Sequence, residues 1–294
     1  MHCLRPFFIF SFDFRTMFIM NGESDSSVQA KRIVLGVQYD GAPWQGWQTQ
    51  LNGLTVQDKL ELALGKFTQQ EISTSCAGRT DAGVHAIEQV VHFDTLLERD
   101  MQSWVRGVNT FLPSSIAVRW ATEVATDTDE NFHARFSARS RTYQYVLYNN
   151  QVRSPLLEGK AGWVFRTLDV DKMRVAAAYL LGEHDFSSFR SVQCQAKSPV
   201  KTMYAIKIEQ RGDLIMFTVH ANAFLHHMVR NIIGSLIYVG NGTQPSAWLK
   251  ELLEAQDRKV AAPTFMADGL YLAKIDYDPK WKLPQIDTPN FLWS

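Results

Sequence analysis

Cysteine is scarce in this chain, with three residues among 294. They are Cys3, Cys76 and Cys194, and this wide spacing matches neither a zinc site nor the dense pattern of a disulfide framework. A chain of this length can bury a sizeable core without such crosslinks, and it is long enough for two domains. We therefore expect free thiols in a reducing, cytoplasmic environment.

Net charge is absent as well, because 30 Lys and Arg residues balance 30 Asp and Glu residues. Overall charge does not indicate a nucleic-acid-binding protein, so any RNA-binding surface has to be a local basic patch. We expect such a patch to draw on Arg79, Arg139, Arg141, Arg190 and Lys197.

Long apolar runs are also missing. The run at residues 7–10 is short and is followed by Asp13 and Arg15, so it does not predict a membrane span. No small-residue cleavage site follows, which argues against a signal peptide. Residues 1–30 are predicted to be a disordered leader, and Met17 or Met20 are alternative start positions.

Hydrophobic periodicity in the rest of the chain predicts an α+β fold. The predicted strands are 33–39, 71–76, 89–93, 116–120, 141–148, 204–209, 214–219 and 270–277, and the predicted helices are 56–67, 100–111, 171–181, 224–236 and 245–256. Apart from the last helix, each half has the order βαββαβ. We expect two ferredoxin-like halves, residues 31–125 and 126–294, to form a mostly antiparallel sheet with helices on one face and a ligand cleft between the halves.

A glycine-rich loop at residues 76–85, with the sequence CAGRTDAGVH, lies between two predicted strands. Gly78 and Gly83 allow a tight bend and a close approach of a ligand to the backbone. The loop carries one carboxylate, Asp81, and Arg79 beside it could bind a phosphate. Taken alone, such a loop is more typical of an ordinary hairpin whose aspartate caps a turn.

Arg230 lies among hydrophobic residues in the predicted helix 224–236. A guanidinium in such surroundings needs a partner, and a carboxylate would satisfy it with two hydrogen bonds. From the residues alone, a functional pair and a purely structural ion pair are equally compatible with this position.

Four histidines lie near these motifs: His85, His92, His226 and His227. None has the spacing of a metal site. Adjacent residues on a helix point about 100° apart and chelate poorly, so ordinary polar histidines are favoured over metal ligands.

Two tryptophans, Trp44 and Trp47, lie in the aromatic loop that follows the first strand. They could stack on nucleic-acid bases. Packing against the core is an equally good interpretation.

The chemistry open to a single Asp81 is limited. It could bind a cation, accept a phosphoryl group or attack an electrophilic carbon. A hydrolase or phosphatase would need a second carboxylate or a Mg²⁺ cluster, and neither is evident in the sequence. A non-catalytic RNA-binding protein with RRM-like halves would show an aromatic and basic RNP string, which we do not find.

Several motifs, taken together, resemble those of the tRNA pseudouridine synthase A family. They are YDG at 39–41, AGRTDAGVHA at 77–86, HARFSAR at 133–139 followed by an Arg-x-Tyr-x-Tyr strand at 141–145, FSSFR at 186–190, HHMVRNI at 226–232 and GLYL at 269–272. They occur in the family's order and span roughly residues 31 to 280. Each motif is weak, whereas the set is specific.

This resemblance implies an isomerase that converts uridine to pseudouridine on the 3′ side of the tRNA anticodon stem-loop, at tRNA positions 38 to 40. It also implies a homodimer that uses no cofactor and no metal. Asp81 resembles the nucleophile and Arg230 its carboxylate partner, which would keep Asp81 ionised. Tyr143 resembles the residue that stacks on the flipped uracil, Leu270 a wall of the uracil pocket, and Arg79 an RNA contact. Attack at ribose C1′ and attack at uracil C6 both remain open.

Overall fold

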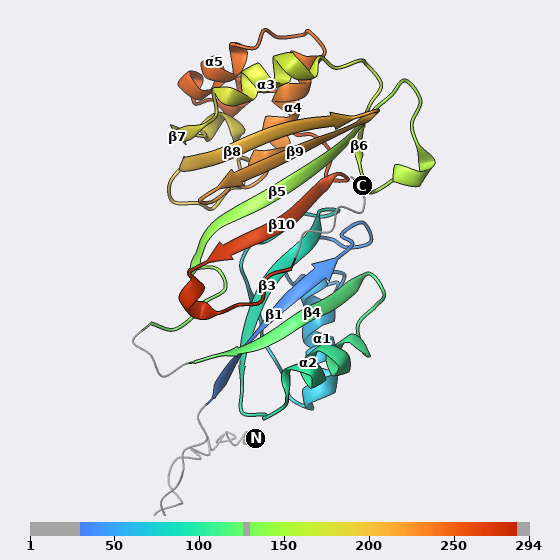
Figure 1. Ribbon diagram of the computed structural model, residues 1–294, viewed down its shortest axis with the longest axis vertical. Coiled ribbons are helices and arrows are strands. Elements are labelled where there is room, and N and C mark those ends of the chain that lie inside the picture. The colour runs from blue at the N-terminus through green and yellow to red at the C-terminus, as the bar shows by residue number, and fades with distance from the viewer. Residues whose placement is uncertain (1–29, 126–129, 287–294) are drawn as a thin grey trace, which may run out of the picture.

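A single ten-stranded sheet runs through the protein (Figure 1). The computed structural model describes residues 30–125 and 130–286, so nearly all of the expected leader lies outside the described residues. Along the sheet the strand order is β4-β1-β3-β10-β5-β9-β8-β7, with β2 beside β3 and β6 beside β5. Among the strand pairs that the described residues form, only β3–β10 and β5–β6 are parallel, which confirms an α+β fold with a mostly antiparallel sheet.

The first half has the predicted order βαββαβ. Its elements are β1 (Lys31–Tyr39), α1 (Val56–Thr68), β2 (Ser75–Cys76), β3 (His85–Thr95), α2 (Met101–Asn109) and β4 (Ile116–Val124). The side chain of Thr55 accepts a hydrogen bond from the backbone N–H of Asp58 and so caps the start of α1. Asp100 caps α2 in the same way through the N–H of Ser103.

The second half contains more elements than the sequence predicts. They are β5 (Ala138–Asn149), β6 (Gly162–Val164), α3 (Val170–Ala178), β7 (Gly182–Asp185), β8 (Val200–Arg211), β9 (Leu214–Ala221), α4 (Met228–Gly240), α5 (Trp248–Ala255) and β10 (Leu270–Tyr277). Short 3₁₀ turns occur at Pro155–Leu157, Ser187–Phe189, Arg258–Val260 and Pro279–Trp281. The strands β6 and β7 are new, and the strand β8 begins four residues before the predicted start at residue 204.

Several predicted helix boundaries differ from those in the structure. The helix α3 ends at Ala178 and not at residue 181, and Gly182 opens β7 with a φ of +97°. The helix α4 begins at Met228 and not near residue 224, because His227 adopts a left-handed conformation with a φ of +63°. Residues 222–227 are therefore a loop.

The C-terminal strand β10 joins the two halves. It pairs in parallel with β3, where Leu272 lies beside Ala86, and antiparallel with β5, where Leu272 lies beside Tyr143. The strand order is β4-β1-β3-β2 in the first half and β10-β5-β9-β8 in the second. Both halves thus arrange their four main strands in the same order.

Side chains of β10 alternate between the two faces of the sheet. Leu270 belongs to the buried core of the second half, and Leu272 to that of the first half. Tyr271 and Ala273 point the other way, into a small cluster with Ile87. The join between the halves is therefore packed on both faces.

The helices form two groups along the sheet (Figure 1). In that view α1 and α2 lie beside β1 and β4, and α3, α4 and α5 lie beside β7, β8 and β9. Both α1 and α4 pass behind the strands, so these two helices cover the same face. Within the described part of the chain, no helix is both long and apolar enough to cross a membrane.

Substituting Leu272→Ala should destabilise the whole protein, because this fully buried side chain packs at the join between the halves. We expect a loss of about 2–5 kcal/mol in the free energy of unfolding, measured by urea denaturation. Leu62→Ala on α1 is the control, since that side chain is half-exposed and its loss should cost less than about 0.5 kcal/mol. Equal losses in the two variants would contradict this packing analysis.

Candidate active site

A large cavity of about 1060 Å³ lies where the two halves meet. Residues of both halves line it, from the loops around β2 and α1 on one side and from α4 and the loop before it on the other. All five residues that the sequence singles out line this cavity: Arg79, Asp81, Tyr143, Arg230 and Leu270. The structure thus brings together side chains that lie up to about 190 positions apart in the sequence.

Hydrogen bonds to neighbouring residues hold the Asp81 loop between β2 and β3 in place. The backbone carbonyl of Thr80 accepts a hydrogen bond from the N–H of Trp47 at 3.0 Å, and the Thr80 hydroxyl pairs with that of Tyr39 at 2.7 Å. The N–H of Val84 donates to the carbonyl of Asp81 at 3.1 Å, which closes the turn. These bonds fix the backbone at Asp81 while its carboxylate points into the cavity.

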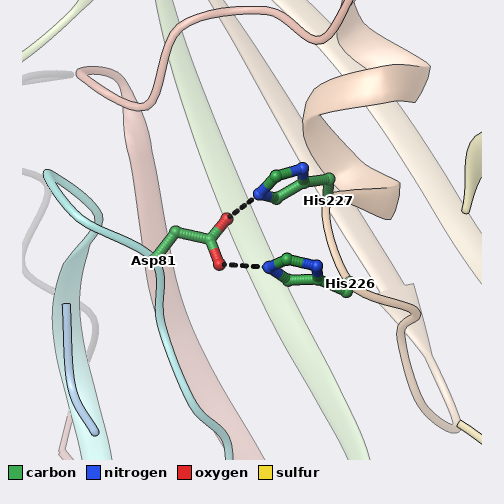
Figure 2. Close-up of side chains that lie close together, drawn as sticks. All are labelled: Asp81, His226 and His227. Atoms are coloured by element: carbon green, nitrogen blue, oxygen red, sulfur yellow. Dashed lines mark ion pairs between the residues drawn. The ribbon is translucent and has the colours of Figure 1, made fainter. Parts of the chain in front are cut away.

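Three nitrogen-bearing side chains surround the Asp81 carboxylate. Nη1 of Arg230 donates to Oδ2 at 3.1 Å. Nε2 of His226 lies 3.2 Å from Oδ1, and Nε2 of His227 lies 3.3 Å from Oδ2 (Figure 2). The carboxylate remains partly exposed to the cavity, so it is both held in place and accessible.

Arg230 is fixed independently of Asp81. Its Nε donates to the backbone carbonyl of Phe265 at 2.8 Å. Gly234, one turn further along α4, allows this approach because a Cβ there would lie 2.5 Å from the carbonyl of Pro263. The segment before β10 therefore orients the guanidinium toward the carboxylate.

The arrangement of His226 and His227 corrects the prediction that they point apart on a helix. Both residues precede α4, and the left-handed backbone at His227 turns both imidazoles toward Asp81, with ring centroids 3.9 Å apart. Burial lowers the pKa of His227 more than the charge of Asp81 raises it. Because α4 has no side-chain cap, the sequence contains no signal for its late start.

Tyr143 and Leu270 form the apolar part of the site. Tyr143 lies on β5 and meets the ring of Phe224 edge-on, with centroids 5.0 Å apart. Burial, and secondarily the negative charge of Asp81, raise the pKa of the Tyr143 hydroxyl, so it stays protonated at neutral pH. Leu270 is buried at the start of β10.

Only some of the residues of the expected basic patch are exposed to solvent. Arg79 is exposed at the cavity and matches the expectation. Arg141 instead donates to the backbone carbonyls of Ala77, Arg135 and Asn222, and burial lowers its pKa. These bonds tie Arg141 to the loops around the cavity, which it also lines.

Two further members of the expected patch are engaged elsewhere. Arg190 donates to the carbonyls of Cys194 and Ala196, and Arg139 pairs with Asp278. Lys197 is exposed but is not among the cavity-lining residues. Arg135, which the sequence analysis did not single out, is exposed and lines the cavity, although it belongs to the HARFSAR motif.

Trp47 packs in the core, so the packing interpretation holds for this residue. Trp44 is only partly buried and packs against the same core. Cys76 and Cys194 are free thiols, and burial raises the pKa of Cys76 to about 11. Cys3 lies outside the described residues.

Comparison with known proteins identifies the family. The family model described as tRNA pseudouridine synthase matches residues 36–146 and 176–278. The chain is 83% identical over 275 residues to the tRNA pseudouridine synthase A of Herminiimonas arsenicoxydans. The aligned region covers 94% of this chain and all of that protein. This chain belongs to the tRNA pseudouridine synthase A family.

A second relative agrees with the first. The tRNA pseudouridine synthase A of Janthinobacterium sp. (strain Marseille) is 82% identical, again over 94% of this chain and all of the relative. Identity of this extent shows an isomerase that converts uridines of the tRNA anticodon stem-loop to pseudouridine.

Solved structures give a much weaker likeness. A structure described as an H/ACA RNP bound to a substrate RNA containing 2′-deoxyuridine aligns with a TM-score of 0.34 and 13% identity, over 78% of this chain and 59% of that chain.

Gly46→Ala should displace the Asp81 loop of this synthase. Gly46 has a φ of +88°, and a Cβ there would lie 2.7 Å from the carbonyl oxygen of Thr80. We expect a loss of about 1–3 kcal/mol in the free energy of unfolding, measured by urea denaturation, together with slower pseudouridine formation.

Gly53→Ala is the matched control. Gly53 also has a positive φ, of +64°, but nothing lies within 4 Å of a Cβ added there. It should show only the backbone strain, about 1 kcal/mol, with normal turnover. If both variants lose turnover equally, the contact between Gly46 and Thr80 does not position Asp81.

Proposed function

We propose that Asp81 is the nucleophile of the isomerisation. The observation that carries this assignment is the composition of the cavity. Among the described residues that line it, Asp81 is the one carboxylate, against the four arginines Arg79, Arg135, Arg141 and Arg230. A glycosidase-like hydrolase would need a second carboxylate here, and a Mg²⁺-dependent phosphatase would need a carboxylate cluster.

The reaction requires a nucleophile of this kind. The bond between N1 of uracil and C1′ of ribose breaks, the base rotates, and a bond forms between C5 and C1′. The proton on C5 leaves, and N1 gains a proton, so the isomerisation is balanced without an oxidant or reductant. Asp81 serves either of two routes, by capturing C1′ or by adding to C6, and in both it forms and then breaks a covalent bond to the substrate.

Arg230 supports this role by pairing with Asp81. The ion pair offsets the cost of holding a carboxylate in a partly desolvated cavity. Because Arg230 is also bonded to Phe265, the carboxylate stays in one orientation before the substrate enters.

The target base has to leave its stack in the RNA, which costs a few kcal/mol. We propose that the ring of Tyr143 stacks on the flipped uracil and that Leu270 closes the pocket behind it. Both side chains line the same cavity as Asp81. We assign the exposed Arg79, and with it Arg135, to contacts with the RNA phosphates at the cavity.

At the level of the whole molecule we propose two ferredoxin-like halves, residues 31–125 and 126–294, with the cavity between them. The shared strand order of the two halves supports this division. We further propose a cytoplasmic homodimer that binds tRNA and needs no cofactor, as the family resemblance implies.

Asp81→Asn should abolish pseudouridine formation while the protein still folds and binds tRNA. The amide keeps the size of the side chain but lacks the anionic oxygen that attacks carbon. Turnover is measured by tritium release from C5-labelled uridine in tRNA, and binding by filter retention. Asp171→Asn, on the exposed surface of α3, is the matched control and should retain full turnover. Wild-type turnover by a folded Asp81→Asn protein would refute the assignment.

Tyr143→Ala should lower kcat/KM far more than Tyr143→Phe, because stacking needs the ring face. A loss of about 1–3 kcal/mol of stacking corresponds to a decrease of roughly 5- to 150-fold for the alanine variant. Tyr204→Ala, at a half-exposed tyrosine on β8, is the control. If the phenylalanine variant is as inactive as the alanine variant, the hydroxyl takes part in the chemistry and stacking is not the main role.

A further inference from the structure

The convergence of His226 and His227 on Asp81 creates a cluster that can do chemistry besides the isomerisation. Figure 2 shows both imidazoles directing Nε2 toward the carboxylate from the loop before α4. The two imidazole nitrogens and a carboxylate oxygen all lie within 4.8 Å of one another. Such a set offers three protein ligands to one metal ion.

The distances are suited to a tetrahedral ion. Around such an ion, with the bond lengths of about 2.0–2.1 Å that zinc makes to nitrogen and oxygen, neighbouring ligand atoms lie roughly 3.3 Å apart. Nε2 of His226 lies 3.2 Å from Oδ1 of Asp81, and Nε2 of His227 lies 3.3 Å from Oδ2. Each imidazole thus already lies at this spacing from one of the two carboxylate oxygens.

The kind of donor selects the kind of ion. Two imidazoles and one carboxylate suit Zn²⁺, Co²⁺ or Ni²⁺, whereas Mg²⁺ and Ca²⁺ prefer oxygen ligands. All three side chains line the cavity and are partly exposed, so an ion can enter and keep a water as a fourth ligand.

Arg230 limits the strength of such a site. Its guanidinium lies 3.1 Å from the same carboxylate and repels a divalent cation. The site should therefore bind metal more weakly than one with the same ligands and no neighbouring positive charge. Moreover, an ion bound here occupies the carboxylate that the reaction needs.

We propose that Asp81, His226 and His227 form a binding site for Zn²⁺ and related transition-metal ions, and that the bound ion inhibits the enzyme by occupying Asp81. The inhibition rests on the proposed role of Asp81, whereas metal binding does not.

The test is titration of the metal-free, untagged full-length protein with Co²⁺, followed by visible absorption. A tetrahedral Co²⁺ site gives intense d–d bands, and Zn²⁺ should displace the cobalt and remove them. His226→Ala and His227→Ala should each weaken cobalt binding by more than the roughly 10- to 100-fold that loss of an outer-sphere partner typically costs. His184→Ala is the matched control, because this partly buried histidine on β7 is not among the cavity-lining residues.

Arg230→Gln provides a change of opposite sign, since removing the positive charge should tighten cobalt binding while both imidazoles remain. In tRNA assays, Zn²⁺ should inhibit the wild-type enzyme and EDTA should restore turnover. The site would be overturned if the wild-type protein gave no tetrahedral cobalt spectrum. It would also be overturned if the two histidine variants had the spectrum and the cobalt affinity of the wild type. A normal cobalt spectrum without zinc inhibition would keep the site and refute its proposed effect on Asp81.

Discussion

The ion pair between Asp81 and Arg230 is the contact on which the architecture of the site depends. Its two residues are separated by 149 positions in the chain and come from different halves of the protein. A carboxylate in a partly desolvated cavity needs a compensating charge. The pair forms only when both halves are held in one continuous sheet. Each partner is also held by its own backbone contacts, Asp81 through Thr80 and Arg230 through Phe265. The pair is thus organised before any substrate binds.

The strand β10 completes this sheet, and it is the last strand of the described chain. Gly269, just before this strand, allows the tight contact, because a Cβ there would lie 2.2 Å from the carbonyl oxygen of Val146. The next residue, Leu270, lines the cavity, and Leu272 enters the core of the first half. A single strand therefore seals the sheet, supplies a wall of the site and couples the stability of the two halves.

Sequence patterns predicted the elements that carry local signals. In the structure, Thr55 and Asp100 cap α1 and α2, and Gly212 adopts a positive φ in the hairpin between β8 and β9. The strands β6 and β7 have three and four residues, too few for a periodic pattern to emerge. The late start of α4 escaped prediction because no capping side chain marks it.

The same contrast applies to the site. Nothing in the spacing of Asp81 and Arg230 places them together, and it was the family resemblance that suggested their pairing. The apolar pattern places His226 and His227 on a helix, where adjacent side chains diverge, so their convergence on Asp81 emerges only in the structure. Arg79 and Arg141 look alike in the sequence, and only burial in the folded chain separates a cavity arginine from a structural one.

The arginines that line the cavity differ in burial and in their bonding partners, and so they have different roles. This division explains how a chain without net charge can act on a polyanion. Arg141 and Arg230 donate to acceptors of the protein itself, to backbone carbonyls and to Asp81 respectively. Their charges shape the cavity and balance its carboxylate. Arg79 and Arg135 are exposed at the same cavity, where phosphates can reach them. On the proposed assignment, the contacts to RNA and the pairing of Asp81 therefore involve separate sets of guanidinium groups, so that one can change without the other.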